Sequence, residues 1–289
     1  MAATATHSET PATAQEAAEL LAAGGRVRIR GGGTRAGWGH VMQPPDVVLS
    51  TAGLNRVVEH NEGDLTAVLE AGVPLREAQQ RFAAAGQMFA LDPPGTPEAT
   101  VGGVFATGDS GPLRHRYGAA RDLIVGITVA LPDGTVAKAG GKVIKNVAGY
   151  DLAKLFAGSY GTLGLIASVS VRLHPLPVRN ATAIASSEDP AALATAASAL
   201  AALPLEADCL DVTWDGDRGH LLVRFGAAAA EHQAESVVVR MRSLGLADAR
   251  AEVEDDEIWN RQRAMQRSED GIVLKVSGRP TDLAAVITA

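Results

Sequence analysis

The sequence predicts an α+β fold divided into two domains, residues 1–177 and residues 178–289. A chain of 289 residues is long enough for about two hydrophobic cores. Glycine is crowded into the first part, where 23 of the 31 glycines lie between Gly31 and Gly164. The second part alternates helices with strands too closely spaced for crossover connections, which predicts an antiparallel α+β sandwich. Pro175 and Pro177 cannot continue a strand ladder and therefore mark the boundary.

The first domain should begin with a helix that Thr10 caps, that has Pro11 at its first position, and that Gly24 and Gly25 end. Residues 91–118 have neither a helical nor a strand period, and such a segment inside a compact domain is usually functional or disordered. Its interspersed apolar residues favour function. The other predicted elements are strands 26–30, 46–51, 55–60, 65–70, 122–131, 136–139 and 165–173, and helices 74–85 and 152–156.

The second domain should begin with an alanine-rich helix from Pro190 to Leu203, capped by Asp189. Gly245 should end a second long helix. The predicted elements that follow the first helix are strands 208–214 and 220–225, helix 228–244, a further strand, a charged helix around 258–267, strand 272–277 and a helix that opens at Pro280.

Charge and cysteine content exclude several classes of protein. A net charge of -7 disfavours non-specific nucleic-acid binding, which depends on basic surfaces. Cys209 is the single cysteine, so the chain cannot build an intrachain disulfide, a multi-cysteine metal site or an iron–sulfur site, and we assign no metal. No apolar run reaches the roughly 20 residues of a membrane helix, and the N-terminus lacks the basic residues of a signal peptide. We therefore expect a cytoplasmic protein.

Gly31-Gly-Gly-Thr-Arg-Ala36 follows a predicted strand and fits the G-x-G-x-x-A pattern of dinucleotide-binding proteins. The Rossmann mechanism needs a helix that starts in this pattern and faces the pyrophosphate. Residues 37–45 contain Gly37, Gly39, Pro44 and Pro45 and cannot form that helix, so we reject a Rossmann fold. Two interpretations remain: a plain turn between strands, or consecutive amides that hold an anion without a helix.

Other segments have weaker functional interpretations. Gly108-Asp-Ser-Gly-Pro112 looks like the nucleophile loop of a chymotrypsin-type protease, but that site needs a histidine and an aspartate on a double β-barrel. The helical segments exclude this barrel, and the candidate histidine bases have no supporting context. Arg114-His-Arg116 would face a phosphate or a carboxylate substrate, or simply be solvated, and the same alternatives hold for Lys142 and Lys145.

Five motifs occur in order along the first domain. They are Gly31-Gly-Gly-Thr34, Asp92-Pro-Pro-Gly95, Thr100-Val-Gly-Gly103, Tyr117-Gly-x-x-Arg-Asp122 and Gly158-Ser-Tyr-Gly-Thr-Leu-Gly-Leu-Ile166. In this order the sequence resembles the FAD-binding flavoproteins related to vanillyl-alcohol oxidase and p-cresol methylhydroxylase (PCMH). Lys145-Asn-Val-Ala-Gly-Tyr-Asp151 resembles the branch with D-lactate and glycolate dehydrogenases. Within it, the sequence is most similar to the FAD-binding accessory subunits of bacterial glycolate oxidases.

The resemblance implies a two-subdomain FAD-binding domain of the vanillyl-alcohol oxidase and PCMH type over residues 1–177, followed by a smaller antiparallel α+β domain over residues 178–289. It implies that amides of the first motif hold the FAD pyrophosphate, and that the second and third motifs line the diphosphate and the isoalloxazine. Residues 108–111 would pass beside the flavin, and the last motif would contact the adenine end. The implied cofactor-binding residues are Gly31, Gly32, Gly33, Thr34, Pro94, Gly95, Thr96, Thr100, Gly102, Gly103, Gly108, Ser110, Gly111, Tyr117, Gly118, Asp122, Gly161, Thr162, Gly164 and Ile166.

Departures from the family pattern refine these expectations. Tyr160 stands where catalytic relatives carry a glutamate, and the His-x-Gly-Asp-Gly-Asn segment of the metal-assisted 2-hydroxyacid site is missing. The resemblance therefore implies an accessory FAD-binding subunit, and we assign no catalytic residue. No histidine lies in the glycine loop and Cys209 lies elsewhere, so we expect non-covalent FAD.

We expect this subunit to support the oxidation of glycolate, a small 2-hydroxyacid, to glyoxylate. The implied partners are the catalytic flavoprotein subunit and the iron–sulfur subunit of a glycolate oxidase complex, which would hold the chain peripherally at the inner membrane face. The resemblance also implies a C-terminal piece beyond Ala289. Two alternatives stay open: a self-sufficient FAD-dependent 2-hydroxyacid dehydrogenase, in which Arg114, His115 or Arg116 anchors the carboxylate, and a flavin-free assembly module.

Overall fold

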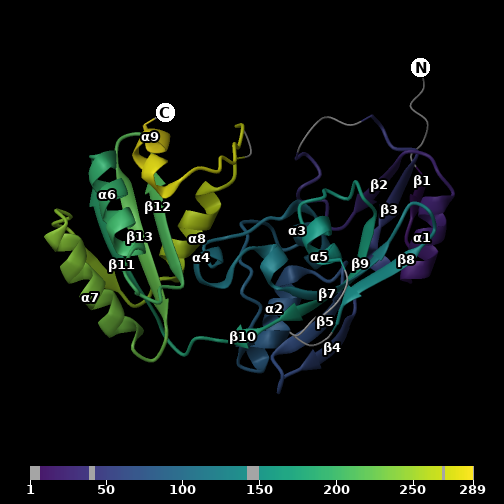
Figure 1. The fold of residues 1–289 in the computed structure, drawn as a ribbon, viewed down its shortest axis with the longest axis horizontal. Helices are drawn as coiled ribbons and strands as arrows, with labels where there is room; N and C mark the ends of the chain where they lie inside the picture. Colours follow the sequence, from purple (N-terminus) through teal and green to yellow (C-terminus); the bar gives the residue numbers. More distant parts are fainter. Residues whose placement is uncertain (1–6, 39–42, 142–149, 269–270, 289) are drawn as a thin grey trace. The chain divides into compact units, whose positions relative to one another are not determined.

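The computed structural model describes residues 7–38, 43–141, 150–268 and 271–288 (Figure 1). The chain divides into two compact units: Met1–Ser110 with Gly118–Leu176, and Gly111–Tyr117 with Pro177–Ala289. The chain therefore passes from one unit to the other three times. The division after Leu176 lies beside the boundary expected at residue 177, whereas the grouping of residues 111–117 with the second unit has no counterpart in the sequence prediction.

A small parallel sheet, in the order β1-β3-β2, forms one layer of the first unit. Helix α1 (Ala14–Ala22) packs Ala17, Ala18 and Leu21 against this sheet and against the larger one. The helix begins later than expected because Thr13, and not Thr10, caps it: the Thr13 hydroxyl accepts a hydrogen bond from the amide of Glu16 at 3.1 Å. The strands are β1 (His7–Glu9), β2 (Val27–Arg30) and β3 (Val47–Ser50), and the 3₁₀ turn η1 (Thr51–Gly53) follows β3.

A five-stranded antiparallel sheet, in the order β4-β5-β9-β7-β8, forms the second layer. Its central strand β9 pairs with β5 and β7 along most of its length, and its inward residues are fully apolar. All five strands were predicted from the sequence. The elements are β4 (Val57–Asn61), β5 (Thr66–Glu70), β7 (Ile124–Ala130), β8 (Val136–Gly140) and β9 (Leu165–Arg172), with helices α2 (Leu75–Ala84) and α5 (Leu152–Phe156) and the strand pair β6 (Gln87–Met88) and β10 (His174–Pro175). Pro175 thus pairs with Gln87 in a two-residue ladder, so the expectation that it takes no part in a ladder is wrong.

The aperiodic segment 91–118 contains two short helices that the sequence analysis did not predict, α3 (Val101–Thr107) and α4 (Arg114–Tyr117), followed by the 3₁₀ turn η2 (Ala120–Asp122). Thr100 caps α3, and Gly108 ends it in a left-handed conformation. Two glycines inside α3 obscure its helical period. Packing requires glycine at position 102, since a Cβ there would lie 2.5 Å from the Cβ of Ala71. Tertiary packing thus forms a helix that local propensity disfavours.

The second unit is built on a four-stranded antiparallel sheet in the order β12-β13-β11-β14. Helices α6 and α7 pack on one face of this sheet (Figure 1), where alternate residues of β11 and β13 join them in an alanine-rich core. Trp259 of α8 and Leu113 pack with Cys209 and Ile184 on the other face. The elements are β11 (Asn180–Ser187), α6 (Pro190–Ala201), β12 (Cys209–Trp214), β13 (Gly219–Gly226), α7 (Ala230–Ser243), β14 (Arg250–Glu252) and α8 (Asp256–Met265).

Two sequence predictions fail in the second unit. Strand β11 was not predicted from the sequence, although it pairs with β13 over eight residues and with β14 on its other side. Its small residues carry little strand propensity, so its conformation depends on these neighbours. Conversely, residues 272–277 form no strand, and Ile272 is 90% exposed. Without a neighbouring strand to pair with, the alternating apolar pattern of this segment does not stabilise a strand.

The described chain closes with the 3₁₀ turn η3 (Pro280–Asp282) and helix α9 (Leu283–Ile287), so the helix expected to open at Pro280 is present. Among the helices of the described residues, none has the length and apolar character needed to cross a membrane.

Candidate cofactor-binding site

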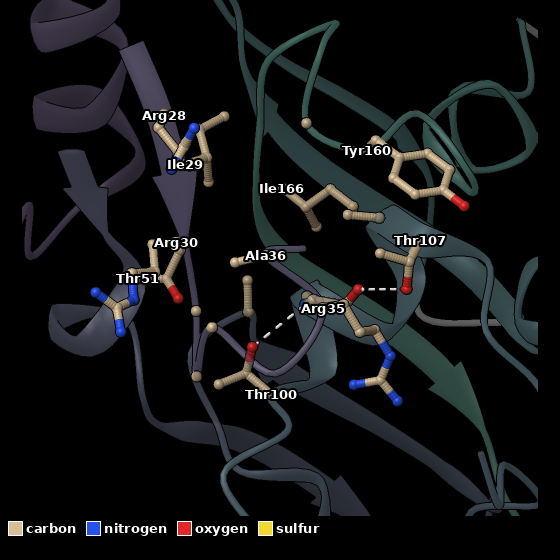
Figure 2. Close-up of a pocket in the computed structure, with 18 of the residues that line it drawn as sticks. Arg28, Ile29, Arg30, Arg35, Ala36, Thr51, Thr100, Thr107, Tyr160 and Ile166 are labelled. Carbon is tan, nitrogen blue, oxygen red and sulfur yellow. Dashed lines mark hydrogen bonds between the residues drawn. The ribbon is translucent and has the colours of Figure 1, made fainter. Parts of the chain in front are cut away.

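A cavity of about 760 Å³ lies in the first unit, between its two sheets. One wall consists of β2 and the loop after it, residues 31–38. The other wall consists of α3, the loop before β9 and Ile166 of β9. Figure 2 shows Arg28 and Ile29 on the first side and Tyr160 and Thr107 on the second. The cavity is therefore formed where segments far apart in the sequence meet.

The structure brings eleven of the twenty sequence-predicted cofactor residues together at this cavity. They are Gly31, Gly32, Gly33, Thr34, Thr100, Gly102, Gly103, Gly161, Thr162, Gly164 and Ile166. The nine that do not line it are Pro94, Gly95, Thr96, Gly108, Ser110, Gly111, Tyr117, Gly118 and Asp122.

The glycine loop after β2 presents a run of available donors. Within the described residues, the amide groups of Gly32, Gly33, Thr34 and Arg35 donate no hydrogen bond to the protein. The backbone is held in this shape by close packing: a Cβ on Gly32 would lie 1.7 Å from the carbonyl oxygen of Glu98. Gly33 has φ +74°, a left-handed value that glycine adopts without strain. Consecutive free amides of this kind form an anion-binding nest.

Two buried hydroxyls at the cavity also have no partner. Within the described residues, three buried side-chain polar atoms make no hydrogen bond: Thr51 Oγ1, Ser159 Oγ and Gln233 Oε1. Thr51 and Ser159 both line the cavity. Because buried polar groups in native proteins are nearly always paired, these two hydroxyls are available to a polar ligand or to ordered water in the cavity.

The charge around the cavity is positive. Arg28 and Arg30 line it, and neither makes an ion pair within the described residues. Arg30 lies against the glycine loop, since a Cβ on Gly33 would be 2.9 Å from its Nε. Arg35 also lines the cavity, but Asp109 neutralises it at 2.6 Å. Arg28 and Arg30 therefore supply the net attraction for an anion.

Tyr160 lines the cavity from the loop before β9, and its ring is directed away from the wall that holds Arg28 and Ile29 (Figure 2). Its φ of +55° is unusual for a residue with a side chain. The amide of Tyr160 donates to the carbonyl of Ala106 at 2.7 Å, and that of Gly158 donates to the carbonyl of Phe105 at 3.0 Å. These bonds fix the loop to α3 and hold the strained residue in place.

Several predicted residues outside the cavity have local structural roles. A Cβ on Gly118 would lie 2.8 Å from that of Asp122, and the Asp122 carboxylate accepts a hydrogen bond from the amide of Ala119 at 2.9 Å. The Ser110 hydroxyl accepts a hydrogen bond from the amide of Ala120 at 3.4 Å. These bonds shape the turn at which the chain returns to the first unit.

The cationic segment 114–116 belongs to the second unit, where it contacts buried carboxylates of that unit. Arg116 Nε lies 3.5 Å from Asp208, and the Tyr117 hydroxyl donates to Asp208 at 3.3 Å. Burial and the nearby Asp208 raise the pKa of Tyr117 to about 12, and burial lowers the pKa of His115. Arg116 is thus held by a protein carboxylate. Lys142 and Lys145, with residues 145–149 of the motif that ends at Asp151, lie outside the described residues.

Sequence reasoning missed several residues of the cavity wall. The alternation of Arg26, Arg28 and Arg30 in a strand that leads into a glycine loop was an available signal in an acidic protein. Thr51 and Ala71 had no signal, because only the fold brings them to the cavity, whereas Ser159 lies inside the last of the five motifs. The lining residues outside the prediction are Arg28, Ile29, Arg30, Arg35, Ala36, Gly37, Trp38, Thr51, Ala71, Ala106, Thr107, Ser159 and Tyr160.

Residues 4–140 match the family model of the FAD binding domain. This part, just under half of the chain, is similar to FAD-binding domains. FAD, the cofactor predicted from the sequence, is therefore confirmed. The residues at the cavity fit it, because free amides and two arginines suit a diphosphate and orphan hydroxyls suit its polar atoms.

Curated relatives cover only parts of this chain. Glycolate oxidase subunit GlcD of Bacillus subtilis is 34% identical over 185 residues, which are 63% of this chain and 39% of the relative. Glycolate oxidase subunit GlcE of Escherichia coli is 38% identical over 122 residues, 42% of this chain and 35% of the relative. A mitochondrial cytochrome D-lactate dehydrogenase of Arabidopsis thaliana is 36% identical over 154 residues, 53% of this chain and 27% of the relative. The chain thus matches less than half the length of these relatives.

Solved structures of the same fold cover nearly the whole chain. An alkyldihydroxyacetonephosphate synthase is 17% identical with a TM-score of 0.72, over 89% of this chain and 57% of that one. Phl p 4.0202, a glucose dehydrogenase, is 17% identical with a TM-score of 0.64, over 87% of this chain and 52% of that one. The predicted fold class, an α+β FAD-binding fold of the vanillyl-alcohol oxidase and PCMH type, is confirmed.

Proposed function

We propose that this cavity is the FAD site and that the loop amides of residues 32–35 hold the diphosphate. The run of four amides without protein acceptors carries this assignment. Arg28 and Arg30 add positive charge near the same loop, which favours a dianion over a neutral ligand. Bound FAD supplies a two-electron acceptor at its flavin ring.

We assign the remaining predicted residues by the family resemblance. Residues 161–166 would face the adenine end, and residues 94–96, 100–103 and 108–111 would follow the diphosphate and the flavin. Tyr117, Gly118 and Asp122 would act indirectly, by shaping the turn beside residues 108–111. FAD would be non-covalent, because no histidine or cysteine of the described chain lines the cavity.

We further propose that the chain is an FAD-binding subunit of a 2-hydroxyacid oxidoreductase complex of the glycolate oxidase type. Similarity to GlcD and to GlcE supports this role. In such a complex the chain would position FAD, while a catalytic flavoprotein subunit and an iron–sulfur subunit complete glycolate oxidation and electron transfer. A peripheral place at the inner membrane face would follow from these partners.

A self-sufficient 2-hydroxyacid dehydrogenase is the second candidate, and similarity to D-lactate dehydrogenases favours it. Its carboxylate anchor would be Arg114 or His115, because Asp208 already engages Arg116.

Purification of the chain tests these proposals. We expect a yellow protein with near-stoichiometric flavin that acid precipitation releases into the supernatant as FAD. Colourless protein that does not take up added FAD would contradict the site and favour a flavin-free assembly module. Reduction of a dye with glycolate or D-lactate by the chain alone would favour the second candidate. Activity only after co-expression with the other subunits would favour the first.

A further inference from the structure

The two orphan hydroxyls of the cavity are held in fixed positions by their own backbones. Thr51 is only 4% exposed, and its carbonyl accepts a hydrogen bond from the amide of Leu54 at 2.9 Å. The Ser159 amide donates to the carbonyl of Phe156 at 3.1 Å, and the Ser159 carbonyl accepts hydrogen bonds from the amide and the hydroxyl of Thr162. The backbone groups are therefore satisfied while the hydroxyls at the cavity are not.

An unpaired buried hydroxyl destabilises a protein, so its presence needs a reason. Close packing does not require a hydroxyl, because valine has nearly the shape of threonine and alanine fits wherever serine does. The third orphan, Gln233, lies on α7 of the second unit and away from the cavity. Thr51 and Ser159 are therefore distinguished by their place at the cavity.

We propose that the Thr51 and Ser159 hydroxyls are cofactor-binding groups, each forming a hydrogen bond with a polar atom of FAD. The proposal rests on the assignment of the cavity to FAD. A hydroxyl can both donate and accept, so it can pair with a phosphate oxygen, a ribityl or ribose hydroxyl, or a ring nitrogen. The two hydroxyls belong to separate segments, one after β3 and one before β9, so they contact the cofactor from two parts of the cavity wall.

This role predicts opposite effects on the empty protein and on its affinity for FAD. Thr51→Val and Ser159→Ala remove the orphan hydroxyl and keep the packing, so the thermal midpoint of the apoprotein should stay the same or rise. The Kd for FAD should increase about five- to ten-fold for each, as expected for one lost hydrogen bond. A residue that only packs would lower the apoprotein midpoint and leave the Kd unchanged.

The experiment measures Kd by titrating apoprotein with FAD and following flavin fluorescence, alongside thermal unfolding without FAD. Thr51→Ser retains the hydroxyl and should bind FAD like the wild type. Gln233→Met is the matched control, because it removes the same kind of orphan from the second unit and should leave Kd unchanged. If Thr51→Val fails to fold, Ser159→Ala and a comparison of Thr51→Ser with Thr51→Ala decide the question.

The outcomes distinguish the proposed role of the two hydroxyls from the assignment of the cavity to FAD. Failure of the wild-type apoprotein to bind FAD would overturn the assignment of the cavity. Normal wild-type binding, with Kd within about two-fold of wild type in the hydroxyl-lacking variants at both positions, would overturn only the role of the two hydroxyls. Loosened binding in Gln233→Met would also count against it, because the effect would then not depend on the cavity.

Discussion

The cavity of the first unit and the buried polar network around Asp255 in the second unit differ in whether their polar groups are paired within the protein. In the first, loop amides, Arg28 and Arg30, and two buried hydroxyls lie at a cavity, and none of them has a hydrogen-bond or ion-pair partner among the residues that the structure describes. In the second, the Thr182 hydroxyl donates to the buried Asp255 at 2.8 Å and accepts from Trp259 Nε1 at 2.8 Å, and Arg224 also binds Asp255. The contrast indicates that the first unit is completed by a ligand and that the network in the second is complete without one.

Among the described residues, each unit also contains a buried arginine–aspartate pair, which allows a direct comparison. In the first, Arg35 and Asp109 are 6% and 8% exposed, and Arg35 also donates to the Thr34 hydroxyl at 2.9 Å and the Pro94 carbonyl at 3.2 Å. This pair therefore joins three loop segments at the cavity. In the second, Arg224 and Asp255 link β13 to the start of α8. The Arg35–Asp109 pair therefore stabilises the cavity loops, and the Arg224–Asp255 pair stabilises the packing of α8 on the sheet of the second unit.

The largest effect is expected from Asp255→Asn, which leaves the Arg224 guanidinium buried without a full countercharge. We expect the free energy of unfolding to fall by about 3–5 kcal/mol. FAD affinity should not change, because the pair lies in the second unit. Urea unfolding and FAD titration measure the two quantities. Asp256→Asn is the control: its side chain is 90% exposed, and its loss should cost less than about 1 kcal/mol.

Asp109→Asn is the equivalent change in the first unit. It should lower the free energy of unfolding by about 3 kcal/mol. In contrast to Asp255→Asn, it should also raise the Kd for FAD about ten-fold, because Arg35 no longer fixes the glycine loop. Asp46→Asn breaks the exposed pair with Arg26 in the same unit and should leave the Kd unchanged. Equal FAD affinity in Asp109→Asn and wild type would remove the distinction between the two pairs.

The pH dependence of stability tests the second unit separately, through the buried Asp211. Burial raises its pKa to about 6, and the opposing effects of Arg114 and of the hydrogen bond from Gln262 are smaller. The native state thus binds this proton more tightly than the unfolded chain, and stability falls as pH rises from about 4 to 6. Asp211→Asn should add roughly 2 kcal/mol to the free energy of unfolding above pH 7. The gain should disappear near pH 4 in urea titrations, and a gain that is constant with pH would refute this cause.

The smallest effect is expected at Tyr160. Tyr160→Gly relieves the positive φ and should stabilise the apoprotein by about 1 kcal/mol. The same change opens the cavity wall and should weaken FAD binding. Thermal unfolding of the apoprotein measures the first effect. Tyr160→Phe is the control, since it retains both the strain and the ring, and a loss of apoprotein stability in Tyr160→Gly would show that the ring packs more strongly than the strain opposes it.

The parts of the fold that sequence reasoning predicted are those with local causes. The five strands of the larger sheet have alternating or continuous apolar patterns, and α6 has Asp189 as its cap. The glycine loop at residues 31–34 was likewise visible, because a left-handed φ and close backbone packing require glycine. Such features depend on residues that are neighbours in the chain.

The parts that escaped prediction have distant causes. Strand β11 is strand-like only between β13 and β14, and α3 depends on the approach of Ala71. Arg35 and Asp109 are 74 residues apart in the sequence, and nothing near either residue indicates the other. Among the described residues, the hydroxyls of Thr51 and Ser159 have no hydrogen-bond partner, and this depends on which distant segments surround them in the fold.

Residues 111–117 belong to the second unit although they lie within the sequence of the first. A single cut in the backbone after residue 117 therefore does not release one unit from the other. A protease that cleaves between Leu176 and Pro177 would sever the backbone, yet the earlier fragment would still have Leu113 packed beside Trp259 and Arg116 paired with Asp208. The two pieces would remain together as a nicked particle. For the same reason, residues 1–176 expressed alone would expose Leu113 and Arg116, because the residues of the second unit that contact them would be missing.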